Sequence, residues 1–178
     1  MPSPIVVRPS TEADMPQVQA IYAHHVLTGI ASFETVPPDE VEMLRRRADI
    51  VGRGLPYLVA TDGEGGAVVG YAYAGLYRPR PAYRHTVEDS VYVAPGQGRR
   101  GIGRQLLAAV VAHCEAMGLR QMIAVIGDSG NSGSIGLHES LGFVRVGLLP
   151  SVGFKFGRWV DSVLMQRPLG EGDGTLPD

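Results

Sequence analysis

The sequence predicts a mixed α/β fold, in which a central twisted sheet is flanked by helices. Three observations lead to this prediction. The 178 residues suit a single core. The apolar periodicity runs in the order strand, helix, helix, three strands, and then helix, strand, helix and two strands. Connections are short, and no internal repeat or linker interrupts them. We therefore assign residues 1–169 to one domain.

The first half of the chain opens with a strand and two helices. Residues 5–8 are β-like, and Thr11 can cap a helix that continues to about His25. Pro37-Pro38-Asp39 begins a second helix, which Gly52 and Gly54 end. Its apolar residues recur at helical spacing, at Val41, Leu44, Ala48 and Val51. Three strands are predicted next, at 58–61, 68–76 and 86–93.

The second half contains the strongest helix, from Gly103 to Met117. Its inward stripe is Leu106, Val110, Cys114 and Met117, and Gly118 ends it. A buried strand at 122–126, a helix at 131–141 and closing strands at 143–149 and 159–166 complete the domain. Residues 170–178 are rich in Gly and Asp, which predicts a flexible tail.

Composition excludes several classes of function. The formal net charge is -2, which gives no electrostatic reason to expect binding to nucleic acid or to an anionic membrane. No apolar run approaches the roughly 18 residues of a membrane span, and no signal peptide is evident. The single cysteine is compatible with a reducing compartment, so we expect a cytoplasmic protein. The histidines lack metal-ligand spacing, and no metal is expected.

The segment from Val91 to Leu107 is a strand, a glycine-rich turn and an amphipathic helix. Glycines let backbone N–H groups approach an anion, and the helix N-terminus adds partial positive charge. Basic side chains gather here, at Arg99, Arg100 and Arg104. The pattern favours a pyrophosphate site over a plain strand–turn–helix. It matches neither a P-loop nor the dinucleotide-binding fingerprint.

Gly101-Ile102-Gly103 resembles the coenzyme A pyrophosphate loop of GNAT acetyltransferases. Gly98 stands where that family commonly has Gln or Arg, so the side-chain contact made from this position is not expected here, whereas the cradle of backbone N–H groups is kept. Further motifs resemble the phosphinothricin and methionine sulfoximine N-acetyltransferases and extend the likeness from Ile5 to Leu169. They are the segments 31–35, 71–75, 86–93, 124–127, 137–143 and 153–161.

This resemblance implies a GNAT fold, splayed so that acetyl-CoA enters between central strands. It also implies direct acetyl transfer to the amino group of a small amino-acid-like substrate, and a homodimer. The strand before the loop would pair with pantetheine amides through Val91 and Val93. Asn131 and Ser134 would face the pantetheine arm.

Two residues are candidate catalysts. An amine must lose a proton before it attacks a thioester, so a base is needed. Glu88 lies on the strand that leads into the coenzyme loop, and the resemblance implies that it is this base. His138 lies on the 131–141 helix, and the resemblance implies a role in catalysis, which we assign to amine deprotonation with Glu88. Position alone is compatible with a surface carboxylate and a structural histidine. The acid for the leaving thiolate is left open.

Substrate contacts are expected from the loop 77–83. Arg78 and Arg80 can hold a carboxylate bidentately, and the resemblance adds Tyr83, with Phe33 as an apolar wall. Three rival functions stay open. They are acetylation of peptide N-termini or polyamines, non-catalytic acyl-CoA binding, and nucleotide binding.

Overall fold

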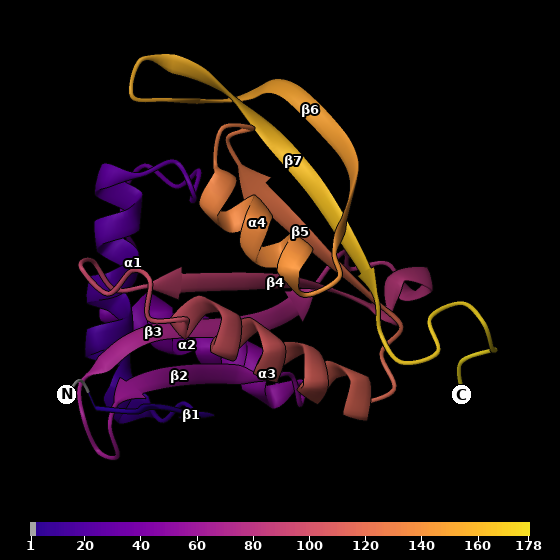
Figure 1. Cartoon of the computed structure of the whole chain (residues 1–178), viewed down its shortest axis with the longest axis horizontal. Coiled ribbons are helices and arrows are strands. Elements are labelled where there is room, and N and C mark those ends of the chain that lie inside the picture. The colour runs from indigo at the N-terminus through magenta and orange to yellow at the C-terminus, as the bar shows by residue number, and fades with distance from the viewer. Residues whose placement is uncertain (1–2) are drawn as a thin grey trace.

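The computed structural model describes residues 3–178 as a seven-stranded sheet with helices on both faces (Figure 1). The strand order is β1-β2-β3-β4-β5-β7-β6, and every neighbouring pair is antiparallel except β4–β5. The strands are β1 Ile5–Pro9, β2 Tyr57–Asp62, β3 Val68–Leu76, β4 Thr86–Val93, β5 Gln121–Gly127, β6 Val144–Lys155 and β7 Arg158–Pro168. The helices are α1 Met15–Thr28, α2 Glu40–Gly52, α3 Ile102–Ala116 and α4 Ser132–Ser140. The predicted fold class and element order are confirmed.

Two helix faces differ from prediction. The expected stripe of α2 is exposed at Val41 and Val51, whereas Met43 and Ile50 are buried against the sheet. In α3, Met117 follows the last helical residue and is exposed, so the buried stripe ends at Cys114. Helical spacing fits more than one stripe when apolar residues surround a helix, and packing against the sheet selects the buried one.

The two faces of the sheet carry different side chains. On the face covered by α1 and α2, a group of aromatic rings packs with centroids 5.1–6.4 Å apart, namely Tyr22, Tyr57, Tyr71, Tyr73 and Tyr92. On the opposite face, α3 packs closely against β3 because Gly70 has no side chain. A Cβ on Gly70 would lie 2.9 Å from Ile102 Cγ2, so glycine is needed where α3 crosses β3.

The sheet opens between β4 and β5. These strands pair in parallel only where Thr86–Glu88 lie opposite Gln121–Ile123. Figure 1 shows β5 diverging from β4 beyond this point, with α4 above the opening. Residues 89–93 therefore pair with β3 but have no ladder partner in β5. The unpaired backbone edge faces a gap in the middle of the sheet.

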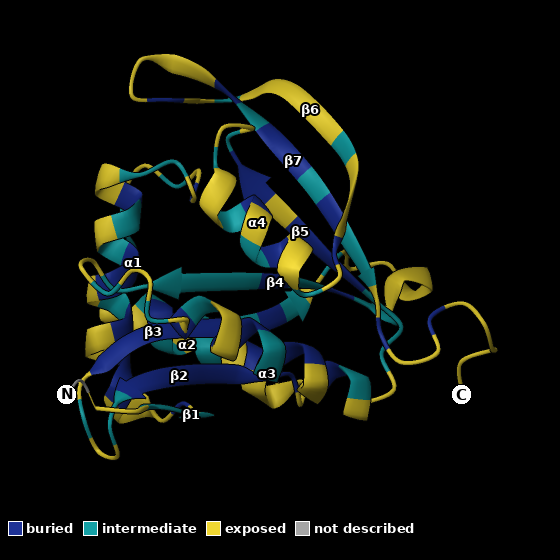
Figure 2. Cartoon of the chain, viewed as in Figure 1, coloured by how far each residue is buried: buried dark blue, intermediate teal, exposed yellow. Residues whose placement is uncertain are grey.

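Strand β6 forms one edge of the sheet and is exposed along much of its length (Figure 2). Many of its exposed side chains are apolar. At the C-terminus, the Arg120 guanidinium donates to Gly172 O, Thr175 Oγ1 and Leu176 O at 2.9–3.1 Å. These bonds fasten the segment 170–178 to the domain, while its flexibility stays a prediction. Within residues 3–178, no helix is long and apolar enough to cross a bilayer.

Candidate active site

Three adjoining cavities occupy the opening of the sheet. The outer cavity holds about 500 Å³ and lies between α1, β4 and α4. The vertex cavity holds about 50 Å³ where β4 and β5 separate, and the inner cavity holds about 220 Å³ beside Glu88 and Phe33. Ala31 and Tyr92 line all three. The cavities therefore follow one another along a single path through the sheet.

Glu88 lines the inner cavity together with Ser90 and Tyr92. Alternate residues of a strand face the same side, so these three side chains share the α1/α2 face. Burial raises the pKa of Glu88, the charge of Asp89 raises it further, and Arg78 opposes the shift. A carboxylate whose pKa is raised toward neutrality is a better proton acceptor than an ordinary glutamate.

His138 lies on the other face of β4 from Glu88. Its Nε2 is 2.9 Å from Asp89 Oδ2, and its Nδ1 is 2.7 Å from Ser134 O. Burial lowers the pKa of His138, but the hydrogen bond and charge of Asp89 and the Ser134 carbonyl raise it, and the net direction is upward. Both ring nitrogens are engaged. This geometry argues against the predicted joint action with Glu88 in amine deprotonation.

The loop after β4 forms an anion cradle. Gly96, Arg99 and Gly101 have positive φ angles of 77°, 66° and 72°, which curl the backbone so that successive N–H groups converge. Within residues 3–178, the N–H groups of residues 98–101 donate to no acceptor. The first turn of α3 adds further free N–H groups and the positive end of its dipole. The loop therefore fits a pyrophosphate.

The three arginines near this loop have different surroundings. Arg99 is exposed on the loop. Arg100 donates to Asp62 Oδ1 at 2.9 Å and to Gln97 Oε1 at 2.6 Å and so braces the loop against β2; its contact with the coenzyme stays a prediction. Arg104 is exposed and donates to Ser140 Oγ at 2.9 Å, at the end of α4. Of these three arginines, Arg100 alone forms an ion pair with a carboxylate among residues 3–178.

Backbone and helix residues surround the outer cavity. Val91 and Val93 line it from β4, and Asn131 and Ser134 line it from α4. Asn131 caps α4 by accepting a hydrogen bond from Ser134 N at 3.2 Å. One acceptor on the β4 edge is already used, because His25 Nε2 lies 2.8 Å from Val93 O.

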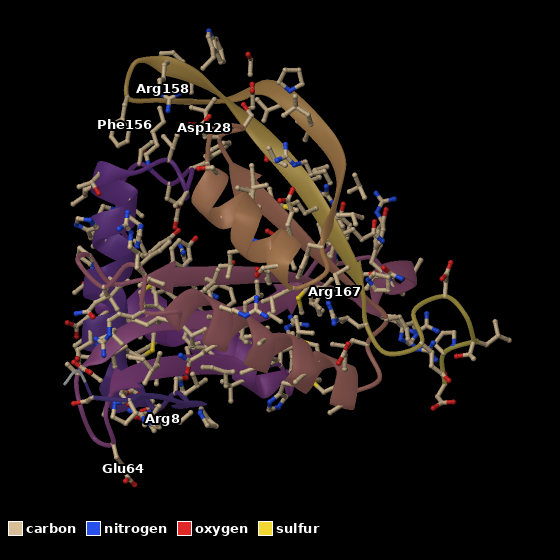
Figure 3. All side chains as sticks on the ribbon, in the orientation of Figure 1. Arg8, Glu64, Asp128, Phe156, Arg158 and Arg167 are labelled. Atoms are coloured by element: carbon tan, nitrogen blue, oxygen red, sulfur yellow. The ribbon has the colours of Figure 1, made fainter. Side chains whose placement is uncertain are left out.

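The rim of the opening is closed by an ion pair. Asp128 lines the outer cavity and lies 3.3 Å from Arg158 at the start of β7. Figure 3 shows these two residues beside the β6–β7 turn, near Phe156. The contact joins the β5–α4 loop to the hairpin above it.

The segment 30–35 forms one wall of the inner cavity and is held from several sides. The buried Lys155 Nζ donates to Ser32 O at 2.8 Å. The Phe33 ring packs against Gly153 so closely that a Cβ added to Gly153 would overlap the ring. Tyr22 donates to Glu34, and Arg46 pairs with Glu34 at 2.8 Å. The wall is fixed by α1, α2 and β6 together.

The predicted substrate loop lies outside these cavities. Arg78, Arg80 and Tyr83 are exposed between β3 and β4, and none of them lines the three cavities of the opening. Arg78 packs over the Tyr77 ring at 5.1 Å. Its charge nevertheless acts on Glu88 and favours the ionised carboxylate. The structure thus brings Phe33 and Glu88 together but leaves this loop at the surface.

Sequence reasoning missed Ser90, Tyr92 and Asp89. Strand alternation could have found the first two, because they follow Glu88 at intervals of two. The same alternation places Asp89 on the face of α4, toward His138. Among residues 3–178, no group of three or more His, Cys, Asp or Glu side chains is arranged to hold a metal ion.

The cavities and the anion cradle together would suit a long, phosphorylated ligand that enters the middle of the sheet. The chain belongs to the acetyltransferase (GNAT) family, whose pattern matches residues 19–143. It is 59% identical over 172 residues to a phosphinothricin N-acetyltransferase of Alcaligenes faecalis, covering 97% of this chain and 86% of the relative. It is 45% identical over 163 residues to an L-methionine sulfoximine/L-methionine sulfone acetyltransferase of Pseudomonas aeruginosa, covering 90% and 92%.

Solved structures agree with this family. A phosphinothricin acetyltransferase from Sinorhizobium meliloti, in complex with AcCoA, superposes with a TM-score of 0.94 at 49% identity and covers 98% of this chain and 93% of its own. The resemblance and the GNAT fold predicted from the motifs are confirmed. The chain is an acetyl-CoA-dependent acetyltransferase.

Proposed function

We propose that this enzyme transfers the acetyl group of acetyl-CoA directly to the amino group of phosphinothricin, methionine sulfoximine, methionine sulfone or an amino acid of similar shape. The observation that carries the proposal is the continuous path from the outer cavity, which Val93 and Leu137 line next to the anion cradle, to Glu88 in the inner cavity. The relatives named above supply the substrate class.

The coenzyme is assigned to the outer cavity and the loop beside it. The free N–H groups of residues 98–101 and the first turn of α3, including Gly103, would hold the pyrophosphate, with Arg99 and Arg104 adding charge at the rim. Val91 and Val93 would offer backbone groups to the pantetheine arm, and Asn131 and Ser134 would face it from α4. The thioester carbonyl supplied by the coenzyme would then lie near the vertex cavity.

Glu88 is the proposed base. An α-amino group with a pKa of about 8 is mostly protonated at neutral pH, so its proton must be removed before it can attack. Glu88 lines the inner cavity, and burial raises its pKa toward that of the amine. Glu34 is also near this cavity, but its hydrogen bonds with Arg46 lower its pKa. Glu88 is therefore better suited to accept the proton.

The acceptor is assigned to the inner cavity. Phe33 would contact its side chain, and Arg78, Arg80 and Tyr83 would reach its carboxylate from the exposed loop. Because these loop residues lie outside the cavity in the single chain, their contact with the acceptor requires the loop to approach the opening. Loss of a bidentate arginine would weaken acceptor binding more than the chemical step.

We also propose a homodimer. The edge strand β6 exposes apolar side chains along its length, at Val144, Val146, Leu148, Leu149, Val152 and Phe154. A long apolar edge of this kind associates with a partner or aggregates. Leu148→Lys is expected to shift the sedimentation coefficient to that of a monomer, and an unchanged coefficient would exclude this edge. A cytoplasmic location stays a prediction, and we further propose that acetylation of herbicide-like compounds such as phosphinothricin confers resistance to them.

The test is release of free thiol from acetyl-CoA with a panel of acceptors. The panel contains phosphinothricin, methionine sulfoximine, methionine sulfone, spermidine and a short peptide. We expect release with the first three and a loss of at least about 100-fold in Glu88→Gln, the lower range for a general base. Glu64→Gln is the matched control, because Glu64 is exposed on the β2–β3 turn, far from the opening (Figure 3). Release with spermidine or peptide alone would overturn the substrate class.

A further inference from the structure

Asp89 and His138 form a buried pair at the point where the sheet opens. The last ladder pair between β4 and β5 is Glu88 with Ile123. The very next residue, Asp89, instead bonds across to α4 through His138. Their side chains are only 2% and 3% exposed, and both residues line the vertex cavity. The pair therefore lies between the coenzyme cavity and the inner cavity.

The hydrogen-bond partners restrict the protonation of the ring, because both of its nitrogens face acceptors when Asp89 is ionised. Nδ1 faces the Ser134 carbonyl, which can only accept, so Nδ1 carries a proton. Nε2 faces the Asp89 carboxylate, which also only accepts when it is ionised. A ring that donates from both nitrogens is an imidazolium. The pair thus holds a transferable proton inside the protein.

The surroundings leave Asp89 as the charged neighbour that matters. Cys114 faces the pair from α3, and burial raises the pKa of its thiol to about 12, so it is uncharged at neutral pH. The Phe143 ring packs edge-on against His138 with centroids 4.9 Å apart. Within residues 3–178, the other carboxylate oxygen, Asp89 Oδ1, has no hydrogen-bond partner. His138 is accordingly the one strong partner of this carboxylate there.

We propose that Asp89 is a positioning residue that keeps His138 protonated, and that His138 donates its Nδ1 proton to the sulfur of the leaving coenzyme. This inference rests on the acetyl transfer proposed above. When the amine nitrogen attacks the carbonyl carbon, the C–S bond breaks and its electron pair stays on sulfur. The proton moves from Nδ1 to that sulfur, which gives the free thiol. The ring is left neutral, with Nε2–H still bound to Asp89.

The two ring nitrogens are unequal, which is why Nδ1 is the donor. Giving up the Nε2 proton would break a charge-assisted hydrogen bond to a buried carboxylate, whereas Nδ1 is bound only to a neutral carbonyl. Ser134, the residue that owns this carbonyl, lines both the outer and the vertex cavity. The hydrogen bond that one ring nitrogen makes decides which nitrogen of a histidine is active, and here the Asp89 carboxylate holds Nε2.

This assignment separates the acid from the base. Glu88 and Asp89 are adjacent in β4, so their side chains project to opposite faces of the sheet. Glu88 would accept the amine proton in the inner cavity while the pair supplies a proton to sulfur at the vertex. A ring that already donates from both nitrogens cannot accept the amine proton. The proposal therefore assigns the protonation of the thiolate to His138, a role left open by the sequence.

The first test reads the charge of the ring without turnover. Histidine side-chain ¹⁵N spectra of the free enzyme are recorded against pH for wild type, Asp89→Asn and Asp173→Asn, with His138→Gln to assign the signal. We expect wild type and the exposed-site control Asp173→Asn to show an imidazolium at pH 7, and Asp89→Asn to lose it. A neutral His138 in wild type at pH 7 would overturn the proposal.

The second test measures the chemical step. We expect His138→Gln to lower kcat by about 10²- to 10⁴-fold, the range for general acid–base catalysis, with little change in either KM. Asp89→Asn is expected to lower kcat and move the basic limb of the kcat profile to lower pH, while the acidic limb stays. Asp89→Glu is expected to restore part of the activity. Unchanged kcat and pH limbs in Asp89→Asn would refute the role.

Thermal melts of each variant separate folding defects from these effects, and Asp89→Glu replaces Asp89→Asn if the latter does not fold. The two proposals fail differently. A wild type that is inactive with every acceptor overturns the proposed function and with it the proton donation, while the spectra still decide whether Asp89 fixes the charge. An active wild type with unaltered variants overturns only the pair.

Discussion

Gly127 is the position where one added methyl group should disturb the active site most directly. It is buried at the end of β5 and lines the vertex and inner cavities. A Cβ there would lie 2.9 Å from Phe33 Cε1 and under 3.0 Å from the Ile30 carbonyl oxygen. Since a backbone carbonyl cannot rotate away alone, Gly127→Ala must displace the whole segment 30–33. That segment is the wall of the inner cavity.

The expected magnitudes follow from this overlap. Overpacking of a tight site costs about 1–3 kcal/mol, which corresponds to a fall in Tm of roughly 2–12 °C for a domain of this size. A displacement of about 1 Å in a positioning element costs about 100-fold in rate. The anion cradle is at the other end of the path, so we expect the Kd for acetyl-CoA to change by less than about tenfold, or about 1.4 kcal/mol.

The assays are a thermal melt, calorimetry with acetyl-CoA and steady-state kinetics with the best acceptor. Gly136→Ala is the matched control. Gly136 is exposed in α4, a Cβ there would meet nothing within 4 Å, and alanine should stabilise the helix by about 0.5–1 kcal/mol. Neither glycine has a positive φ, so neither alanine strains the backbone, and crowding occurs only at Gly127. If Gly127→Ala has the same Tm and the same kcat as Gly136→Ala, the added Cβ does not displace the segment 30–33.

Three further predictions concern single contacts. Burial raises the pKa of Glu88, so wild type loses stability as pH rises through that pKa. Glu88→Gln is therefore expected to have a higher Tm than wild type at pH 7, and an equal or lower Tm would contradict the predicted destabilisation by the ionised carboxylate. Lys155→Met removes the hydrogen bond to Ser32 O and is expected to lower the free energy of unfolding by about 1–3 kcal/mol and to raise the KM of the acceptor, with Lys155→Arg intermediate. An unchanged KM would mean that Lys155 does not hold the segment 30–35 in place for acceptor binding. Gly70→Ala places a Cβ 2.9 Å from Ile102 Cγ2 and is expected to lower the free energy of unfolding, measured in denaturant, by about 1–3 kcal/mol. An unchanged denaturant midpoint would mean that α3 shifts away from β3 without cost.

Local patterns predicted the elements because glycines and apolar runs mark where strands and helices end. The strands 68–76 and 86–93 have the predicted bounds, and the other elements differ by a few residues, apart from the longer β6. The apolar face of α2 could not be predicted, because Val41 and Met43 belong to different stripes of the same helix. Only contact with β2 and β3 distinguishes them.

The site shows a similar division between local and long-range information. The anion cradle is encoded in consecutive residues, and the structure preserves its turn and helix start. The function of Arg100 is not local, because its partner Asp62 lies 38 residues earlier in the chain. A basic residue beside a phosphate-binding loop has the same sequence signature whether it binds a ligand or an internal carboxylate.

Glu88 and Asp89 are adjacent in the sequence but have different surroundings in the structure. Adjacent carboxylates in a sequence suggest one acidic patch, yet a strand sends them to opposite faces. Their different partners then give them opposite effects on protons. Glu88 faces a cavity, where burial makes it a better proton acceptor, whereas Asp89 faces a histidine that it holds in the protonated form. The pleat of β4 is therefore the physical reason why one Glu-Asp dipeptide can support proton removal on one side of the sheet and proton delivery on the other.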